Sequence, residues 1–203
     1  FYIEWAVDAG VDMIEHPLPR TDEVIAKMAT QGVAADPTLV PYSYIFDIAG
    51  GYYGSTSRRF SFSKTDNVEM LARLREAGIE VGIGTDLVFD WFRYLPSAYI
   101  TELESFVRAG YTAREALTIA TGGSATLLDM GDKLGTLEPG KLADVLIVDG
   151  DPEADLRTLA NVEYVIRDGE VVVDRGRVFV PPHTALPEPG EGGRGEWNQG
   201  SRR

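Results

Sequence analysis

Two polar residues in this sequence stand directly after short apolar runs, where the catalytic side chains of α/β proteins are often found. His16 follows the run 11–15, and Asp86 follows the run 79–85. A neutral imidazole at a strand end can bind a divalent metal, and a carboxylate beside that metal can accept a proton and return it. Each residue also has an ordinary alternative role, His16 as a structural histidine and Asp86 as a turn or helix-capping aspartate.

A second group of candidates lies in the segment 41–64, which is rich in glycine, serine and aromatic residues. Long loops inside compact domains are often functional. Arg58 and Arg59 could bind a substrate carboxylate through paired hydrogen bonds, with Tyr53 contributing to the same substrate site. The alternative is a solvated basic pair on a surface loop. Residues 90–93 (DWFR) present the same choice.

The elements that must position these residues alternate between strand-like runs and amphipathic helices. The runs are at 11–16, 33–40 and 79–85. Helix starts are indicated at Thr21, at a capping box of Asp66 with Glu69, and at a second box of Thr112 with Glu115 in a helix through Leu128. One buried helix face is predicted at Tyr99, Leu103, Phe106 and Val107. Alternation of this kind predicts parallel strands with crossover helices, in a number that suits the last part of a (β/α)8 barrel.

The pattern changes to short antiparallel strands in the C-terminal third. Apolar runs at 142–148, 162–166 and 170–173 surround a strong hairpin signal, Asp168-Gly169. We therefore predict an α/β chain in three parts. These are strands and helices of a barrel at 1–132, a small antiparallel β region at 133–180, and a disordered tail at 181–203 in which His183 is exposed and inert.

Composition narrows the classes of partner. The 203 residues carry a net charge of -13, which disfavours nucleic acid as a partner, and they include no cysteine for disulfides or thiolate metal sites. No apolar run has the roughly 20 residues that a membrane span needs. Because the sequence opens on Phe1 within a helix, we interpret it as truncated. Targeting signals would then lie outside it, which leaves the compartment undetermined, with the cytoplasm as the default.

Three segments in order carry a family resemblance. They are I-E-H at 14–16 with P-T-L at 37–39, G-I-G-T-D at 82–86, and the run 102–169. That last run contains G-x-L-x-P-G-K-x-A-D at 135–144, followed by G-D-P at 150–152. Together they resemble the C-terminal half of the two-domain amidohydrolases, the subgroup with imidazolonepropionase-like and Xaa-Pro dipeptidase-like enzymes.

The resemblance implies a (β/α)8 barrel with a β-sandwich formed by both chain ends. It places His16 at the end of the sixth strand as a metal ligand, and Asp86 at the end of the eighth as both ligand and catalytic residue. The family's other ligands would precede Phe1. Lys141 and Asp144 would be structural turn residues of the sandwich. One or two divalent ions are implied, with zinc favoured.

The resemblance also implies hydrolysis of a carbon–nitrogen bond in a small-molecule substrate, an amide, peptide or cyclic amide. Hydroxide bound to the metal would attack the carbonyl, with Asp86 acting first as base and then as acid. Assembly into a homo-oligomer is compatible with this expectation. Two alternatives stay open, a non-catalytic binding protein with the same fold and a lactone or phosphoester hydrolase using the same centre. With ligands missing, we expect the isolated chain to be inactive.

Overall fold

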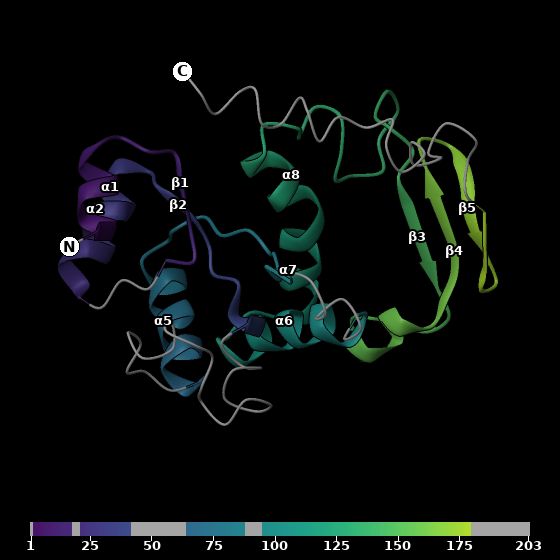
Figure 1. Ribbon diagram of the computed structural model, residues 1–203, viewed down its shortest axis with the longest axis horizontal. Helices are drawn as coiled ribbons and strands as arrows, with labels where there is room; N and C mark the ends of the chain where they lie inside the picture. Colours follow the sequence, from purple (N-terminus) through teal and green to yellow (C-terminus); the bar gives the residue numbers. More distant parts are fainter. Residues whose placement is uncertain (1, 18–20, 42–63, 88–94, 180–203) are drawn as a thin grey trace, which may run out of the picture.

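The computed structural model describes residues 2–17, 21–41, 64–87 and 95–179, and shows a mixed α/β fold (Figure 1). Its helices are α1 (Tyr2–Asp8), α2 (Asp22–Gln31), α5 (Lys64–Glu76), α6 (Ser97–Arg108), α7 (Ala113–Thr118), the π-helical turn η2 (Ile119–Gly123), α8 (Ser124–Leu127) and the 3₁₀ helix η3 (Leu156–Ala160). Its strands are β1 (Met13–Glu15), β2 (Ala34–Asp36), β3 (Val145–Val148), β4 (Val162–Arg167), β5 (Glu170–Asp174) and β6 (Arg177–Val178). Among the described residues, none of the helices combines the length and apolar character that a bilayer crossing requires.

The three parallel segments predicted from the sequence are present but shorter than expected. β1 pairs with β2 in parallel, and Ala35 of β2 forms a parallel bridge with Val81. The expected strand at 79–85 is thus reduced to a single bridge. The expected strand at 33–40 ends at Asp36, because the chain turns helical at 39–41.

Helix boundaries follow local chemistry where it is strong. Thr21 accepts a hydrogen bond from the Val24 N–H at the start of α2, and Gly32 ends the helix in a left-handed conformation. The capping box of Thr112 with Glu115 is confirmed at α7. However, the helix predicted to run through residue 128 is interrupted by the π-helical turn η2.

Two expectations about the helices are wrong. α5 begins at Lys64, so Asp66 lies inside the helix and not at the N-cap position that the predicted capping box requires. On α6, Leu103 and Phe106 are buried, but Val107 is 40% exposed. Val107 is the second-to-last residue of α6, and the buried face that the periodicity predicted does not include it.

One hydrophobic core joins the parallel segments to the helices around them. Its fully buried side chains include Val7 of α1, Met28 of α2, Leu71 and Leu74 of α5, Leu103 and Phe106 of α6, and Ala116 of α7. The core therefore holds the helices against the parallel segments. It thereby also fixes the positions at which those segments end.

The antiparallel sheet has the strand order β3-β4-β5-β6 and stands at the opposite end of the molecule from α1 and α2 (Figure 1). The predicted hairpin is confirmed, because Asp168 and Gly169 join β4 to β5 with φ values of 49° and 81°. The Asp144 carboxylate accepts a hydrogen bond of 2.7 Å from the Asp168 N–H. Several apolar side chains of this sheet are exposed, namely Leu146, Ile147, Val171 and Val178.

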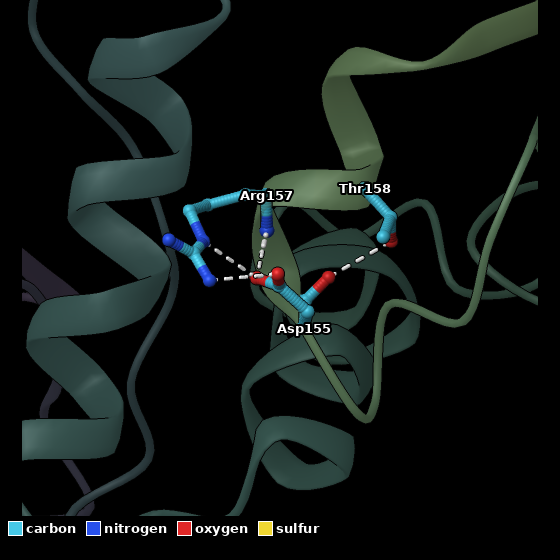
Figure 2. A network of polar contacts seen from close by, with 3 residues as sticks. All are labelled: Asp155, Arg157 and Thr158. Atoms are coloured by element: carbon cyan, nitrogen blue, oxygen red, sulfur yellow. Dashed lines mark hydrogen bonds and ion pairs between the residues drawn. The ribbon is translucent and has the colours of Figure 1, made fainter.

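A short polar network starts the 3₁₀ helix that connects β3 to β4 (Figure 2). Asp155 accepts hydrogen bonds from the Arg157 backbone N–H at 3.0 Å and from the Arg157 guanidinium at 2.8 Å. The Thr158 hydroxyl donates to the Asp155 carbonyl at 2.8 Å. Leu156 is thereby held in the main core, which attaches the antiparallel sheet to the helices.

Candidate functional site

The fold brings together the two residues that the sequence singled out. His16 directly follows β1, and Asp86 lies five residues beyond the bridge at Val81. The His16 Nε2 atom is 3.7 Å from the Asp86 Oδ2 atom, and the two side chains are 42% and 49% exposed. The two side chains are therefore close enough to contact the same ion or substrate, and exposed enough for an ion or a substrate to reach them.

Each of the three parallel segments is followed by a residue with an unusual, left-handed φ angle. His16, Thr38 and Asp86 have φ values of 52°, 45° and 44°. Left-handed backbone is uncommon outside glycine, and for a β-branched residue such as threonine it is an outlier. Strained residues of this kind gather at functional sites, where the surrounding structure holds them in place.

Thr38 is a site residue to which the sequence reasoning gave no role, although P-T-L at 37–39 was part of the resemblance. Its Oγ1 atom lies 2.5 Å from the Nδ1 atom of His16, and Thr38 is only 2% exposed. The hydrogen bond occupies one ring nitrogen of His16. The other ring nitrogen faces Asp86.

Asp36, at the end of β2, is a second residue that the sequence did not reveal. Burial raises its pKa to about 6, with a further increase from Glu15, although a hydrogen bond from the Gly84 N–H and the His16 side chain lower it. Among the described residues, its Oδ1 atom is buried without a hydrogen-bond partner. A Cβ atom at Gly84 would lie 2.5 Å from Asp36 Oδ2, so only glycine fits there without a shift.

Glu102 of α6 is a third residue that the sequence did not reveal, and it holds the backbone next to the site. The residue is 0% exposed, and its two carboxylate oxygens accept hydrogen bonds from the N–H groups of Leu39 at 2.8 Å and Val40 at 2.7 Å. Burial raises its pKa to about 8, although these two hydrogen bonds to the ionised form lower it. Glu102 thereby anchors the backbone that follows Thr38.

The donor set suits a divalent metal. Imidazole nitrogen and carboxylate oxygen both bind zinc at about 2 Å, so atoms 3.7 Å apart can contact one ion. In the part of the chain that the structure describes, no group of three or more histidine, aspartate and glutamate residues could hold a metal. Catalytic zinc usually has three protein ligands, so His16 and Asp86 supply only part of such a site.

The remaining sequence candidates divide into two groups. Asp144 holds the hairpin turn, and Lys141 contacts Thr136 and Glu138, in keeping with structural roles. The other candidates lie outside the described residues, namely Tyr53, Arg58, Arg59, residues 90–93 and His183.

Comparisons with known proteins show the family to which the chain belongs. A family model described as the amidohydrolase family matches residues 3–173. Imidazolonepropionase of Alkaliphilus metalliredigens is 27% identical over 186 residues, covering 87% of this chain and 38% of that protein. An uncharacterised protein of Mycobacterium tuberculosis is 31% identical over 180 residues, covering 86% of this chain and 44% of that protein.

The fold gives the same answer as the sequence comparison. The crystal structure of a Xaa-Pro dipeptidase with bound methionine has a TM-score of 0.73 and 29% identity, covering 83% of this chain and 41% of that one. The chain thus spans less than half the length of these three proteins. The match extends through the parallel segments, the site residues and most of the antiparallel sheet. The chain therefore belongs to the amidohydrolase family.

Proposed function

We propose that this chain forms part of a metal-dependent hydrolase that cleaves carbon–nitrogen bonds in an amide, a peptide or a cyclic amide. The observation that carries the proposal is the 3.7 Å approach of His16 Nε2 and Asp86 Oδ2 at the carboxyl ends of parallel segments. The names of the relatives support the bond type, since a Xaa-Pro dipeptidase is by name an enzyme that cleaves a peptide bond.

We also propose that residues 1–132 form the last strands and helices of a (β/α)8 barrel, and residues 133–180 part of a β-sandwich. The parallel order β1–β2–Val81 with intervening helices supports the first assignment. The exposed apolar side chains on the antiparallel sheet support the second, because a sandwich packs such faces against a second sheet. Further metal ligands would be residues that correspond to the part of the relatives that this chain does not span.

A divalent metal in this site, for which we propose zinc, would polarise the scissile carbonyl and make water a better nucleophile. His16 Nε2 and Asp86 Oδ2 are the atoms of this chain that would hold it. The Asp86 carboxylate would accept a proton from the attacking water and then deliver it to the leaving nitrogen. Its half-exposed side chain gives a small-molecule substrate direct access to that proton.

For substrate recognition we propose a carboxylate on the substrate, bound by Arg58 or Arg59 with Tyr53 nearby in sequence. Paired hydrogen bonds from a guanidinium would orient that carboxylate. Replacing each arginine with alanine should raise KM for substrates with a free carboxylate more than for their amidated forms. Equal effects on both forms would show that the pair is only surface charge.

The proposed activity is tested on the whole natural protein that carries this chain. Elemental analysis should find a bound divalent metal, and a strong chelator should abolish hydrolysis of dipeptides, N-acyl amino acids or cyclic amides, with recovery on adding zinc. If the zinc-loaded protein hydrolysed only lactones or phosphoesters, the proposed carbon–nitrogen bond would be wrong and one of those ester bonds would take its place. Protein that binds no metal and hydrolyses none of these would instead indicate a non-catalytic member of the family.

A further inference from the structure

The contact between Thr38 and His16 suggests more than packing. Thr38 has a φ of 45°, a backbone conformation that is costly for a β-branched residue. Its hydroxyl is the group that could compensate for that cost. That hydroxyl lies 2.5 Å from His16 Nδ1. At 2% exposure, Thr38 has almost no contact with solvent that could compete for this hydrogen bond.

The backbone on both sides of Thr38 is fixed. Pro37, which precedes it, is fully buried and has a ring-locked φ. The two N–H groups that follow, of Leu39 and Val40, donate to the two carboxylate oxygens of the fully buried Glu102. Since α6 carries Glu102 into the main core beside Leu103 and Phe106, the position of the Thr38 hydroxyl is set by the core.

The hydrogen bond between the Thr38 hydroxyl and Nδ1 links the position of the His16 proton to the state of the nitrogen that faces Asp86. If Nδ1 carries the proton and donates to Thr38 Oγ1, then Nε2 keeps its lone pair, on the side of Asp86. Metal-binding histidines depend on such partners, which fix the ring orientation and the tautomer.

We propose that Thr38 is a positioning residue for His16. Its hydroxyl accepts the Nδ1 proton and holds the tautomer in which Nε2 is free to bind a cation, and Glu102 holds Thr38 in place. The inference rests on the proposed function, because it assigns Thr38 its role toward the same metal site.

The test compares Thr38→Val, which keeps the branched shape but removes the hydroxyl, with Thr38→Ser, which keeps the hydroxyl. In the whole natural protein, zinc affinity measured by chelator competition should fall about 10- to 100-fold in Thr38→Val. It should stay close to the wild-type value in Thr38→Ser. Thr30→Val is the matched control, because the exposed Thr30 hydroxyl donates only to Ala26 O within α2.

A second measurement reports the tautomer without metal. In metal-free protein labelled with ¹⁵N-histidine, the His16 signals, assigned with a His16→Gln variant, should show a protonated Nδ1 in the wild type and in Thr38→Ser. Thr38→Val should shift the proton toward Nε2. If Thr38→Val does not fold, Thr38→Ala removes the hydroxyl as well as the branch and carries the same expectations.

The outcomes separate the two proposals. Wild-type zinc affinity together with unchanged His16 signals in the hydroxyl-free variant would overturn the role of Thr38 and leave the proposed function standing. Wild-type protein that binds no zinc would overturn the proposed function, while the nitrogen signals would still decide whether Thr38 sets the tautomer. A purely structural role for Thr38 would lower thermal stability but leave the tautomer unchanged.

Discussion

Asp86 and Asp168 have nearly the same backbone conformation but belong to very different regions. Their φ values are 44° and 49°. Asp168 sits in a two-residue hairpin beside Gly169, and its N–H donates to Asp144, so a local turn accounts for its conformation. Asp86 instead follows a parallel segment and faces His16, which follows a strand far away in the sequence. A left-handed φ angle thus accompanies chain reversal in one region and the presentation of a side chain to the site in the other.

The two regions also differ in what holds them together. In the antiparallel sheet, β3, β4, β5 and β6 pair with strands close to them in sequence. At the parallel end, His16, Thr38 and Asp86 come from three separate segments, and Glu102 fixes one of them from a fourth. Changes at the parallel end should therefore alter chemistry, whereas matched changes in the hairpin should not.

The largest difference is expected between Asp86→Asn and Asp168→Asn. Asparagine keeps the shape and tolerates left-handed backbone, but it cannot take up a proton. In the whole natural protein, turnover should fall at least ~10²-fold in Asp86→Asn with little change in bound metal, whereas Asp168→Asn should retain wild-type turnover. Steady-state kinetics on a confirmed substrate and elemental analysis provide the check. Equal turnover in the two variants would remove Asp86 from the mechanism.

The next difference concerns two glutamates that accept backbone hydrogen bonds. Glu102→Gln leaves one of the N–H groups of Leu39 and Val40 facing an amide NH₂ group, and an unsatisfied buried donor costs about 1–3 kcal/mol. Glu115→Gln, in the exposed capping box of α7, should cause a smaller loss because water can replace the bond. Urea unfolding of both variants measures the free energies of unfolding. A larger loss in Glu115→Gln would contradict the role given to Glu102.

A third pair contrasts neighbouring glycines on the approach to Asp86. Gly84→Ala would bring Cβ within 2.5 Å of Asp36 Oδ2, whereas the nearest atom to a Cβ at Gly82 is Leu127 Cδ1 at 3.4 Å. Displacing the backbone two residues before Asp86 should reduce kcat/KM on the order of tenfold, since small misplacements of catalytic groups are costly. Gly82→Ala should have a much weaker effect. Similar rates for both variants would mean that the contact with Asp36 does not position Asp86.

The sequence predicted best what depends on neighbours in the chain. The capping box of Thr112 with Glu115 and the hairpin at Asp168-Gly169 require only local turn chemistry, and both are confirmed. The contribution of Glu102 could not be predicted, because a glutamate within an amphipathic helix ordinarily faces water. Its role depends on Leu39 and Val40, which α6 meets only in the folded structure.

The site itself was predictable only in part. His16 and Asp86 were identified from their places after apolar runs and from the family resemblance, and the fold brings them together. Thr38 and Asp36 were not identified, because the apolar run 33–40 predicted a longer strand. A strand continuing past Asp36 would not have placed Thr38 in its left-handed turn beside His16.

The last comparison concerns how stability depends on pH above the ordinary glutamate pKa, a range in which Glu102 should contribute to the slope and Glu115 should not. Burial raises the Glu102 pKa from 4.5 to about 8, with Asp36 adding to the increase and Arg108 opposing it. Between these two values the folded protein binds more protons than the unfolded chain. The free energy of unfolding should therefore fall as the pH rises from about 4.5 to about 8.

For Glu115 the sign is opposite, because hydrogen bonds from Thr112 lower its pKa. Its contribution to stability is complete above the ordinary glutamate pKa and is lost only as the pH falls below it. Urea midpoints measured from pH 5 to pH 8 should accordingly show a shallower decline in Glu102→Gln than in the wild-type protein. Glu115→Gln should keep the wild-type slope, although its overall stability is lower. The same decline in Glu102→Gln as in the wild type would mean that the buried carboxyl keeps the ordinary glutamate pKa, because its two backbone hydrogen bonds offset the cost of burial.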